Sequence, residues 1–222
     1  MLSHGFLENS INKKFVNNIL EQITKEYSSD ILQGKTYFDN IHIKIPLVKN
    51  LINKKIEKKI KLLLKNQSIS LEQVELHILL KNGSPIPHHQ DNFYHCISPE
   101  DSLKILIPLQ PLNKLSGALG FMNCNHTFET LNHIASSIKN FSAFIEDKDF
   151  KDLKYDYTFY DYKTGDSSYH FVSSVHYSDG NKTNKDSYFL VFRFQSSRAK
   201  TSQKDQKKYE FIRELHLNKL DK

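Results

Sequence analysis

Three histidines and one carboxylate fall within residues 87–95, directly after an apolar run and a turn. In a β-strand, residues two positions apart point to the same side of the sheet. His89 and Asp91 therefore have the spacing that places an imidazole and a carboxylate next to each other. Such a pair provides two of the three ligands of a 2-His-1-carboxylate site, which binds non-haem Fe(II). An H-x-D pattern also arises by chance in polar loops, so the rest of the chain must supply the third ligand.

The third ligand has to come from a distant strand, and the downstream candidates are His126, His133, His170, His176 and His216. His176 has the most suitable surroundings, because a turn at residues 164–166 and a strand-like run precede it. It stands where a returning strand could carry a side chain back to the H-x-D segment. His170 shares the strand parity of His176 and is the reserve candidate.

Composition points to a soluble protein with a single domain. The chain has 222 residues, of which 38% are hydrophobic and 25% charged, values typical of globular proteins. Its segments show neither a membrane span nor a signal peptide, and Cys96 and Cys124 are expected as free thiols in the cytoplasm. The net charge of +6 comes from lysines spread along the chain. It favours an anionic small-molecule substrate mildly, and no nucleic-acid motif or membrane partner accompanies it.

The chain begins with helical periodicity and continues with short strands. Helices are expected at 10–27 and 47–65, with a short strand at 36–45 between them. Strands are expected at 71–81, 103–109, 117–122, 155–162, 168–175 and 187–195. A helical insertion is expected within 126–139, a charged surface loop at 140–154, a polar mobile stretch at 196–208 and a last helix near the end.

This order indicates a mainly β fold with flanking helices, a sandwich or barrel buttressed by the N-terminal helices. Within a single domain of residues 1–222, we expect a helical buttress at 1–69, a β core at 70–195 and a C-terminal helical tail at 196–222. The sequence does not indicate an oligomeric state.

Four ordered motifs resemble the phytanoyl-CoA dioxygenase family of Fe(II)- and 2-oxoglutarate-dependent oxygenases. The family's H-Q-D-x-x-Y is matched by His89-Gln90-Asp91 with Tyr94. Its G-A-L segment, which ends near a histidine, is similar to residues 117–126. Its G-D and H-x-S-x-x-N motifs are similar to residues 165–166 and 176–181. The resemblance covers about residues 76–194, over half of the chain.

The resemblance implies a double-stranded β-helix, also called a jelly roll or cupin-type barrel. It implies that His89, Asp91 and His176 bind Fe(II), with 2-oxoglutarate and O2 at the remaining metal positions. Such enzymes couple the decarboxylation of 2-oxoglutarate to the hydroxylation of a C–H bond. A carboxylate at Asp91 implies a hydroxylase rather than a halogenase, because related halogenases lack it. Tyr94 and His95 are expected near the substrate pocket.

The chain departs from the family at the residue that anchors 2-oxoglutarate. The family has an arginine about eleven residues after the distal histidine, assisted by the serine of H-x-S, which is Ser178 here. Serine occupies the arginine position at residue 187 and cannot replace a guanidinium that grips a carboxylate with two hydrogen bonds. Lys185, roughly 7 Å away along a strand, and Lys104, on the strand after H-x-D, are equally ranked substitutes. Arg193 lies roughly 20 Å further on and is discounted.

This departure keeps two other hypotheses open. The chain could be a metal-binding cupin whose reaction needs no 2-oxoglutarate. It could also be a non-catalytic barrel that binds a ligand.

Overall fold

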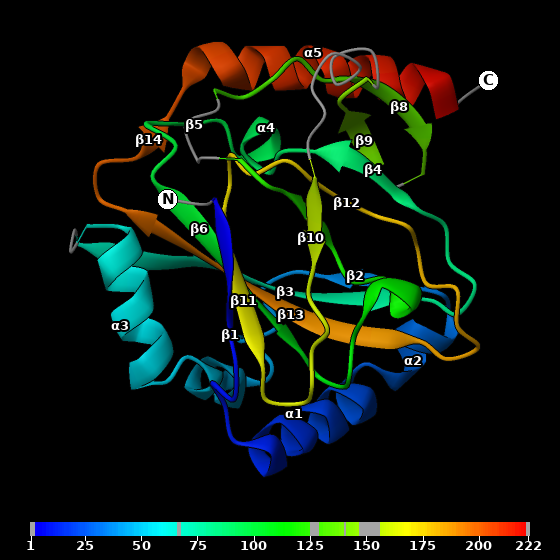
Figure 1. The fold of residues 1–222 in the computed structure, drawn as a ribbon. Coiled ribbons are helices and arrows are strands. Elements are labelled where there is room, and N and C mark those ends of the chain that lie inside the picture. Colours follow the sequence, from blue (N-terminus) through cyan, green and yellow to red (C-terminus); the bar gives the residue numbers. More distant parts are fainter. Residues whose placement is uncertain (1–2, 66–67, 125–128, 140, 147–155, 221–222) are drawn as a thin grey trace.

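Six strands, drawn from both halves of the chain, build the larger of the two main sheets in a computed structural model (Figure 1). The structure describes residues 3–65, 68–124, 129–139, 141–146 and 156–220. The larger sheet has the order β1-β11-β6-β13-β3-β2, and each strand is antiparallel to its neighbours. Its strands are β1 (His4–Leu7), β11 (Ser167–Phe171), β6 (Ser102–Pro108), β13 (Ser187–Ser196), β3 (Ile69–Leu79) and β2 (Tyr37–Phe38).

A smaller sheet faces the larger one and has the order β10-β7-β12-β4. Its strands are β10 (Tyr157–Phe159), β7 (Gly120–Met122), β12 (His176–Ser178) and β4 (Ile86–His89). Successive strands cross between the sheets, from β3 to β4 to β6 to β7 and again from β10 to β13. This is the topology of a double-stranded β-helix, so the expected jelly roll is confirmed.

Helices cover the outer face of the larger sheet. The structure has α1 (Lys13–Glu26) and α3 (Lys54–Leu63) there, and each begins after an asparagine cap, Asn12 or Asn53, whose side chain accepts backbone N–H bonds. The apolar stripe of α1, at Val16, Ile19 and Ile23, belongs to the main hydrophobic core. Alternate residues of β6 and β13 belong to the same core, so both faces of these strands are buried.

Several shorter elements connect these layers. They are α2 (Ser28–Leu32), the 3-10 helices η1 (Pro46–Leu51) and η2 (Lys114–Ser116), α4 (Asn92–His95), and the paired strands β5 (Ile97–Ser98) and β14 (Lys200–Thr201). None of the helices in the described part of the chain combines the length and the apolar composition that a bilayer span requires.

The structure differs from the expected elements in four places. Strand 36–45 shortens to β2, and helix 47–65 divides into η1 and α3 because Asn53 caps a new helix there. Residues 4–7 form β1, which the sequence did not predict. The expected helix within 126–139 is wrong for its described part, which contains β8 (Ile134–Ile138), paired with the following β9 (Phe141–Phe144) in a hairpin. His126 and most of the expected loop 140–154 lie outside the described residues.

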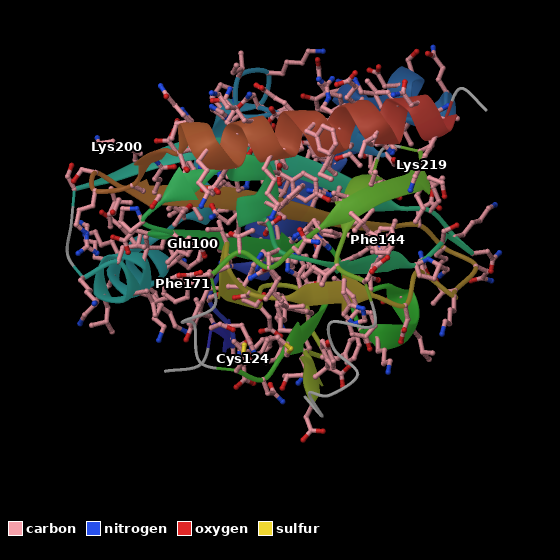
Figure 2. The ribbon with its side chains drawn as sticks, turned by 90° about the horizontal axis from the view of Figure 1, so that it is seen from above. Glu100, Cys124, Phe144, Phe171, Lys200 and Lys219 are labelled. Atoms are coloured by element: carbon pink, nitrogen blue, oxygen red, sulfur yellow. The ribbon has the colours of Figure 1, made fainter. Side chains whose placement is uncertain are left out.

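The C-terminal helix α5 (Gln203–Leu220) crosses the top of the molecule above α4 and the β8–β9 hairpin (Figure 1). His216 Nδ1 donates to the carbonyl of Ser136 at 2.8 Å, and Lys219 Nζ donates to the carbonyl of Ala135 at 2.6 Å. Figure 2 labels Lys219 near the end of this helix and Phe144 on β9. The polar stretch 196–208, expected to be mobile, therefore contains β14 and the start of a helix that docks on the hairpin.

Replacing Phe192 by alanine should lower the free energy of unfolding by about 3 to 5 kcal/mol. Phe192 is fully buried on β13 in the core between sheet and helices. Urea denaturation measures the change, and Leu62→Ala, at a position 62% exposed on α3, is the control, with an expected change within about 0.5 kcal/mol. Equal effects of the two substitutions would contradict this account of the core.

Candidate metal centre

Two histidines from neighbouring strands of the smaller sheet present the same ring nitrogen to one point. His176 on β12 is the register partner of His89 on β4. The Nδ1 of His89 lies 2.9 Å from the carbonyl of Pro87, and the Nδ1 of His176 lies 2.9 Å from the carbonyl of Ser174. A carbonyl can only accept, so Nδ1 carries the hydrogen in both rings. Each Nε2 therefore carries no hydrogen, and its lone pair is free to bind a metal ion, as in metal-binding histidines.

Asp91 reaches the same point by a turn rather than along a strand. β4 ends at His89, and Asp91 has helical backbone angles, φ −60° and ψ −31°, at the start of α4. Its Oδ2 lies 3.8 Å from Nε2 of His176. The ligand atoms of His89, Asp91 and His176 all lie within 4.8 Å of one another, and all three residues are buried. The structure thus brings together the three residues that the sequence singled out.

Gln90 ties the H-x-D segment to the loops around it. Its amide Nε2 donates to the carbonyl of Ser173 at 2.7 Å, and its Oε1 accepts from the N–H of Leu131 at 2.7 Å. Its own backbone N–H donates to Nε2 of His133 at 3.1 Å. Because Nε2 of His133 is already an acceptor in this bond, His133 supports the backbone of the site and is not available as a ligand.

Two residues of the larger sheet form hydrogen bonds with the Asp91 carboxylate. Lys104 Nζ on β6 lies 2.9 Å from Oδ1, and His170 Nε2 on β11 lies 3.1 Å from Oδ2. Since a carboxylate only accepts, the His170 ring donates from Nε2. His170, the reserve ligand of the sequence analysis, is therefore placed behind Asp91 and outside the group of three.

A second buried carboxylate, Glu75 on β3, shares the lysine. Lys104 Nζ lies 3.5 Å from Oε2 of Glu75. Tyr37 donates its hydroxyl to the other oxygen at 2.9 Å, and His77 Nε2 lies 3.2 Å from Oε2. The sequence analysis missed Glu75. A signal was available in the sequence: Glu75 lies between the apolar residues Val74 and Leu76 of an expected strand, so its carboxylate points to the opposite face of that strand.

Arg193 belongs to this cluster although its distance from residue 187 led us to discount it. β13 starts at Ser187 and runs toward the candidate ligands, where Arg193 pairs in register with Lys104. The inner positions before it, Phe189 and Val191, lie in an apolar core cluster. The Nε of Arg193 is buried and has no hydrogen-bond partner among the described residues, while Nη1 donates to Gln195 Oε1 at 2.9 Å. The strand thus carries its inward cation near the candidate metal site and not at its start.

The electrostatic environment keeps the three candidate ligands in their metal-binding forms. Burial, with the nearby His176, lowers the pKa of His89 to about 3, and burial also lowers the pKa of His176 to about 4. Burial alone would raise the pKa of Asp91, but Lys104 and His176, together with the His170 hydrogen bond, lower it well below its usual range. Neutral imidazoles and an ionised carboxylate are the forms that bind metals.

The remaining sequence-predicted residues lie in different surroundings. Lys185 is exposed in the loop before β13. Ser178 is buried, donates to the carbonyl of Gly117 at 3.0 Å and accepts from the N–H of Gly180 at 3.1 Å. The structure therefore brings Lys104 to the candidate ligands, leaves Lys185 at the surface and engages Ser178 in a local turn.

Tyr94 and His95 lie beside the candidate centre on α4. The Tyr94 ring packs edge-on to His89 with centroids 6.1 Å apart, and its hydroxyl donates to the carbonyl of Ala143 at 2.6 Å. The Nε2 of His95 is buried, and no group in the described part of the chain forms a hydrogen bond with it. Burial and the charge of Lys104 lower the pKa of His95 to about 3, so its ring is neutral and interacts electrostatically with Lys104.

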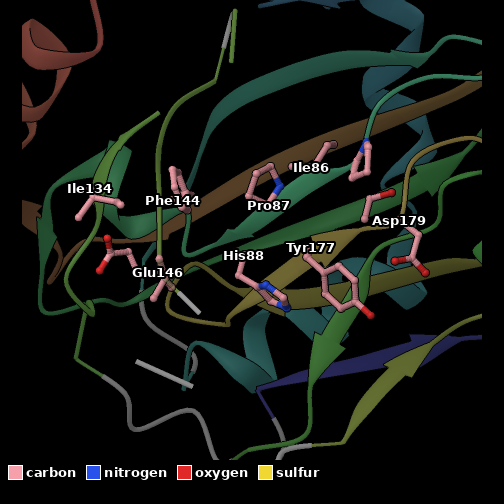
Figure 3. Close-up of a pocket in the computed structure, with 11 residues that line it drawn as sticks. Ile86, Pro87, His88, Ile134, Phe144, Glu146, Tyr177 and Asp179 are labelled. Atoms are coloured by element: carbon pink, nitrogen blue, oxygen red, sulfur yellow. The ribbon is translucent and has the colours of Figure 1, made fainter. Parts of the chain in front are cut away.

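A hollow of about 580 Å³ lies on the outer side of the strands that carry the two histidines (Figure 3). Its walls come from β4, β12 and the β8–β9 hairpin and include Ile86, Pro87, His88, Ile134, Phe144 and Tyr177. His88 and Tyr177 alternate with the candidate ligands along their strands, and their rings lie 4.4 Å apart. The side chains of His88 and Tyr177 therefore point away from the candidate ligands, whereas Pro87 and Ser178, which share the strand parity of the ligands, also line the hollow.

Known structures share this architecture at low sequence identity. The epimerase SnoN in complex with Fe3+, alpha ketoglutarate and nogalamycin RO is 12% identical, with a TM-score of 0.71 over 89% of this chain and 80% of SnoN. EvdO2 from Micromonospora carbonacea var. aurantiaca complexed with 2-oxoglutarate is 14% identical, with a TM-score of 0.70 over 91% and 89%. EctD from S. alaskensis in its apoform is 13% identical, with a TM-score of 0.73 over 91% and 76%.

The likeness shows the fold. No protein-family model matches the chain, and no curated protein matches its sequence. At these identities the chemistry has to be argued from the residues of the site.

The free energy of unfolding of the metal-free protein should fall steeply below about pH 6.5. The pKa values of His89, His95 and His133 are lowered to about 3 and that of His176 to about 4, all chiefly by burial, from an ordinary value of 6.5. As the pH falls, the unfolded chain binds these protons first, so each histidine costs about 1.4 kcal/mol of stability per pH unit between the two values.

Urea denaturation between pH 7.5 and 5 measures this slope. His95→Leu removes one of the four groups and should make the slope shallower by about 1.4 kcal/mol per pH unit. Stability that is constant over this range would contradict the burial of neutral histidines.

Proposed function

We propose that this protein is a non-haem Fe(II)- and 2-oxoglutarate-dependent oxygenase that hydroxylates a C–H bond of a small molecule. The observation that carries the proposal is the convergence of His89, Asp91 and His176, with both Nδ1 atoms held by backbone carbonyls. The proposal includes kinship with the phytanoyl-CoA dioxygenase family, supported by the ordered motifs and by the shared fold of SnoN, EvdO2 and EctD.

The donor set fits Fe(II). Two imidazoles and one carboxylate on one side of an ion leave its other positions to a co-substrate and to O2. When bound, the iron and 2-oxoglutarate would supply the oxidation of the substrate. The residues of the chain hold the ligand atoms in place: Pro87 and Ser174 fix the two rings, and Lys104 and His170 fix the carboxylate.

Lys104 and Arg193 are the cations we propose for the distal carboxylate of 2-oxoglutarate. They are register partners on the inner face of the larger sheet, and Lys104 contacts a candidate ligand directly. The buried, unpartnered Nε of Arg193 is a donor that suits a carboxylate oxygen. Lys104 and Arg193 are better candidates than Lys185 and Ser178, because Lys185 is exposed and the hydroxyl of Ser178 is engaged in local hydrogen bonds.

Tyr94 and His95 are proposed to line the substrate pocket, because α4 follows Asp91 directly and places them beside the site. The net charge of +6 favours a small anionic substrate. We propose that the protein acts in the cytoplasm.

A second candidate function is a metal-dependent reaction that needs no 2-oxoglutarate. The observation in its favour is the serine at residue 187, followed by apolar inner positions at Phe189 and Val191. Calorimetric titration of 2-oxoglutarate into the Fe(II)-loaded, oxygen-free protein separates the two candidates, because only the first requires binding.

His89→Ala and His176→Ala should each reduce Fe(II) affinity by at least about a hundredfold, because each removes one of three protein ligands. His88→Ala is the matched control, since His88 lies next to a candidate ligand but lines the hollow on the other side of the strand. Anaerobic calorimetric titration with Fe(II) measures the affinities. Parent-like Fe(II) binding by His89→Ala would contradict the assignment of the centre.

The activity itself is tested by succinate formation from 2-oxoglutarate in the presence of Fe(II), ascorbate and O2. Uncoupled turnover without a substrate should be measurable and should disappear in Asp91→Ala. Absence of succinate with every substrate class tried, together with no binding of 2-oxoglutarate to the Fe(II) form, would rule the proposal out.

Arg193→Met should raise the Kd of 2-oxoglutarate by about tenfold or more, because it removes a charge-assisted hydrogen bond to the carboxylate. Lys185→Ala is the control and should leave the Kd unchanged. Calorimetry on the metal-loaded, oxygen-free protein gives both values. A larger effect of Lys185→Ala than of Arg193→Met would contradict this assignment and would indicate that Lys185, in the loop before β13, binds the carboxylate.

A further inference from the structure

The candidate ligand Asp91 and three nearby residues form a group of four buried or partly buried charges, and their formal charges cancel. Asp91 and Glu75 are carboxylates, and Lys104 and Arg193 are cations. Lys104 lies between both carboxylates and is only 7% exposed. Charges in such a site interact strongly, because little water screens them. Without metal the cluster is therefore electrically balanced.

A divalent cation disturbs this balance. It would bind the same Asp91 carboxylate whose Oδ1 lies 2.9 Å from Lys104 Nζ. The ammonium would then face a like charge across the carboxylate, because Oδ2 of Asp91 is the oxygen nearest His176; its other partner, Glu75, lies at 3.5 Å. Glu75 cannot follow the lysine freely, because Tyr37 and His77 hold its two oxygens. The metal alone therefore leaves the site with two uncompensated positive charges.

A dianion restores neutrality. An anion with one chelating end and one distal carboxylate would place negative charge both on the metal and against Lys104 and Arg193. We propose that Lys104 couples the two ligands, so that this centre binds a divalent metal tightly only together with a dianion. The inference rests on the proposed metal centre and adds the linkage between metal and co-substrate.

The coupling is reciprocal. If the dianion raises the metal affinity by some factor, the metal must raise the affinity of the dianion by the same factor. Lys104 contributes to both sides of this linkage: its charge, 2.9 Å from Oδ1 of Asp91, repels a metal bound to the same carboxylate, and it attracts the anion. Its removal should strengthen binding of the metal alone and weaken the coupling, whereas removal of a residue that only supports the fold would weaken both.

The experiment is calorimetric titration of Mn(II) into metal-free protein, with and without 2-oxoglutarate. In the parent, 2-oxoglutarate should raise the Mn(II) affinity by about tenfold or more. Lys104→Met should bind Mn(II) alone more tightly than the parent, and its coupling factor should be smaller. Lys104→Arg keeps the charge and should keep the coupling.

Lys104→Met leaves Glu75 buried without its cation, so its thermal unfolding is measured alongside. The double variant Lys104→Met, Glu75→Gln removes both charges of this inner pair and should show the same gain in Mn(II) affinity. If both variants are folded and bind Mn(II) alone no more tightly than the parent, the inference is overturned.

Oxalate separates this inference from the proposed function. If 2-oxoglutarate binds none of the metal-loaded forms, the proposed function fails. Coupling between Mn(II) and oxalate that is present in the parent and reduced in Lys104→Met would still support the charge linkage. Equal coupling with oxalate in both proteins would overturn it.

Discussion

The carboxylate of Asp91 is contacted by side chains from both sheets of the barrel. From the smaller sheet, His89 and His176 present their Nε2 atoms toward it. From the larger sheet, Lys104 and His170 each hold one of its oxygens. The candidate metal centre therefore depends on the distance between the sheets, which the packing of the apolar core around Phe121 and Val191 sets.

This arrangement requires burial on both faces of the larger sheet. Helices α1 and α3 cover its outer face, so the inner face can hold charges in an environment of low polarity. Buried charges are costly unless they are paired. Lys104 is paired with both Asp91 and Glu75, whereas the half-buried Arg193 donates to the neutral Gln195 and its Nε has no partner among the described residues. That atom and the balanced charges are the features that make the inner face suitable for an anion beside a metal.

Periodicity and turn residues predicted most strands and the first and last helices. They did not predict β1, because four residues at a chain end carry too short a pattern, or the β8–β9 hairpin, whose buried side depends on α5 packing over it. Among the site residues, the H-x-D spacing and the position of His176 were readable. Glu75 was hidden in an apolar run. The pairing of Arg193 with Lys104 was not readable either, because spacing along a strand does not tell which strand lies beside it.

What the sequence determined by itself was a mainly β sandwich or barrel and the candidate ligands, because alternation of side chains and residue type are local properties of the chain; the jelly roll was implied by the family resemblance. What only the tertiary structure decided was the set of partners around Asp91. Lys104, His170, Glu75 and Arg193 lie on four strands that are far apart in sequence and adjacent through the sheet register. Register comes from packing the sheet against helices and against the opposite sheet, and no local pattern in the chain records it.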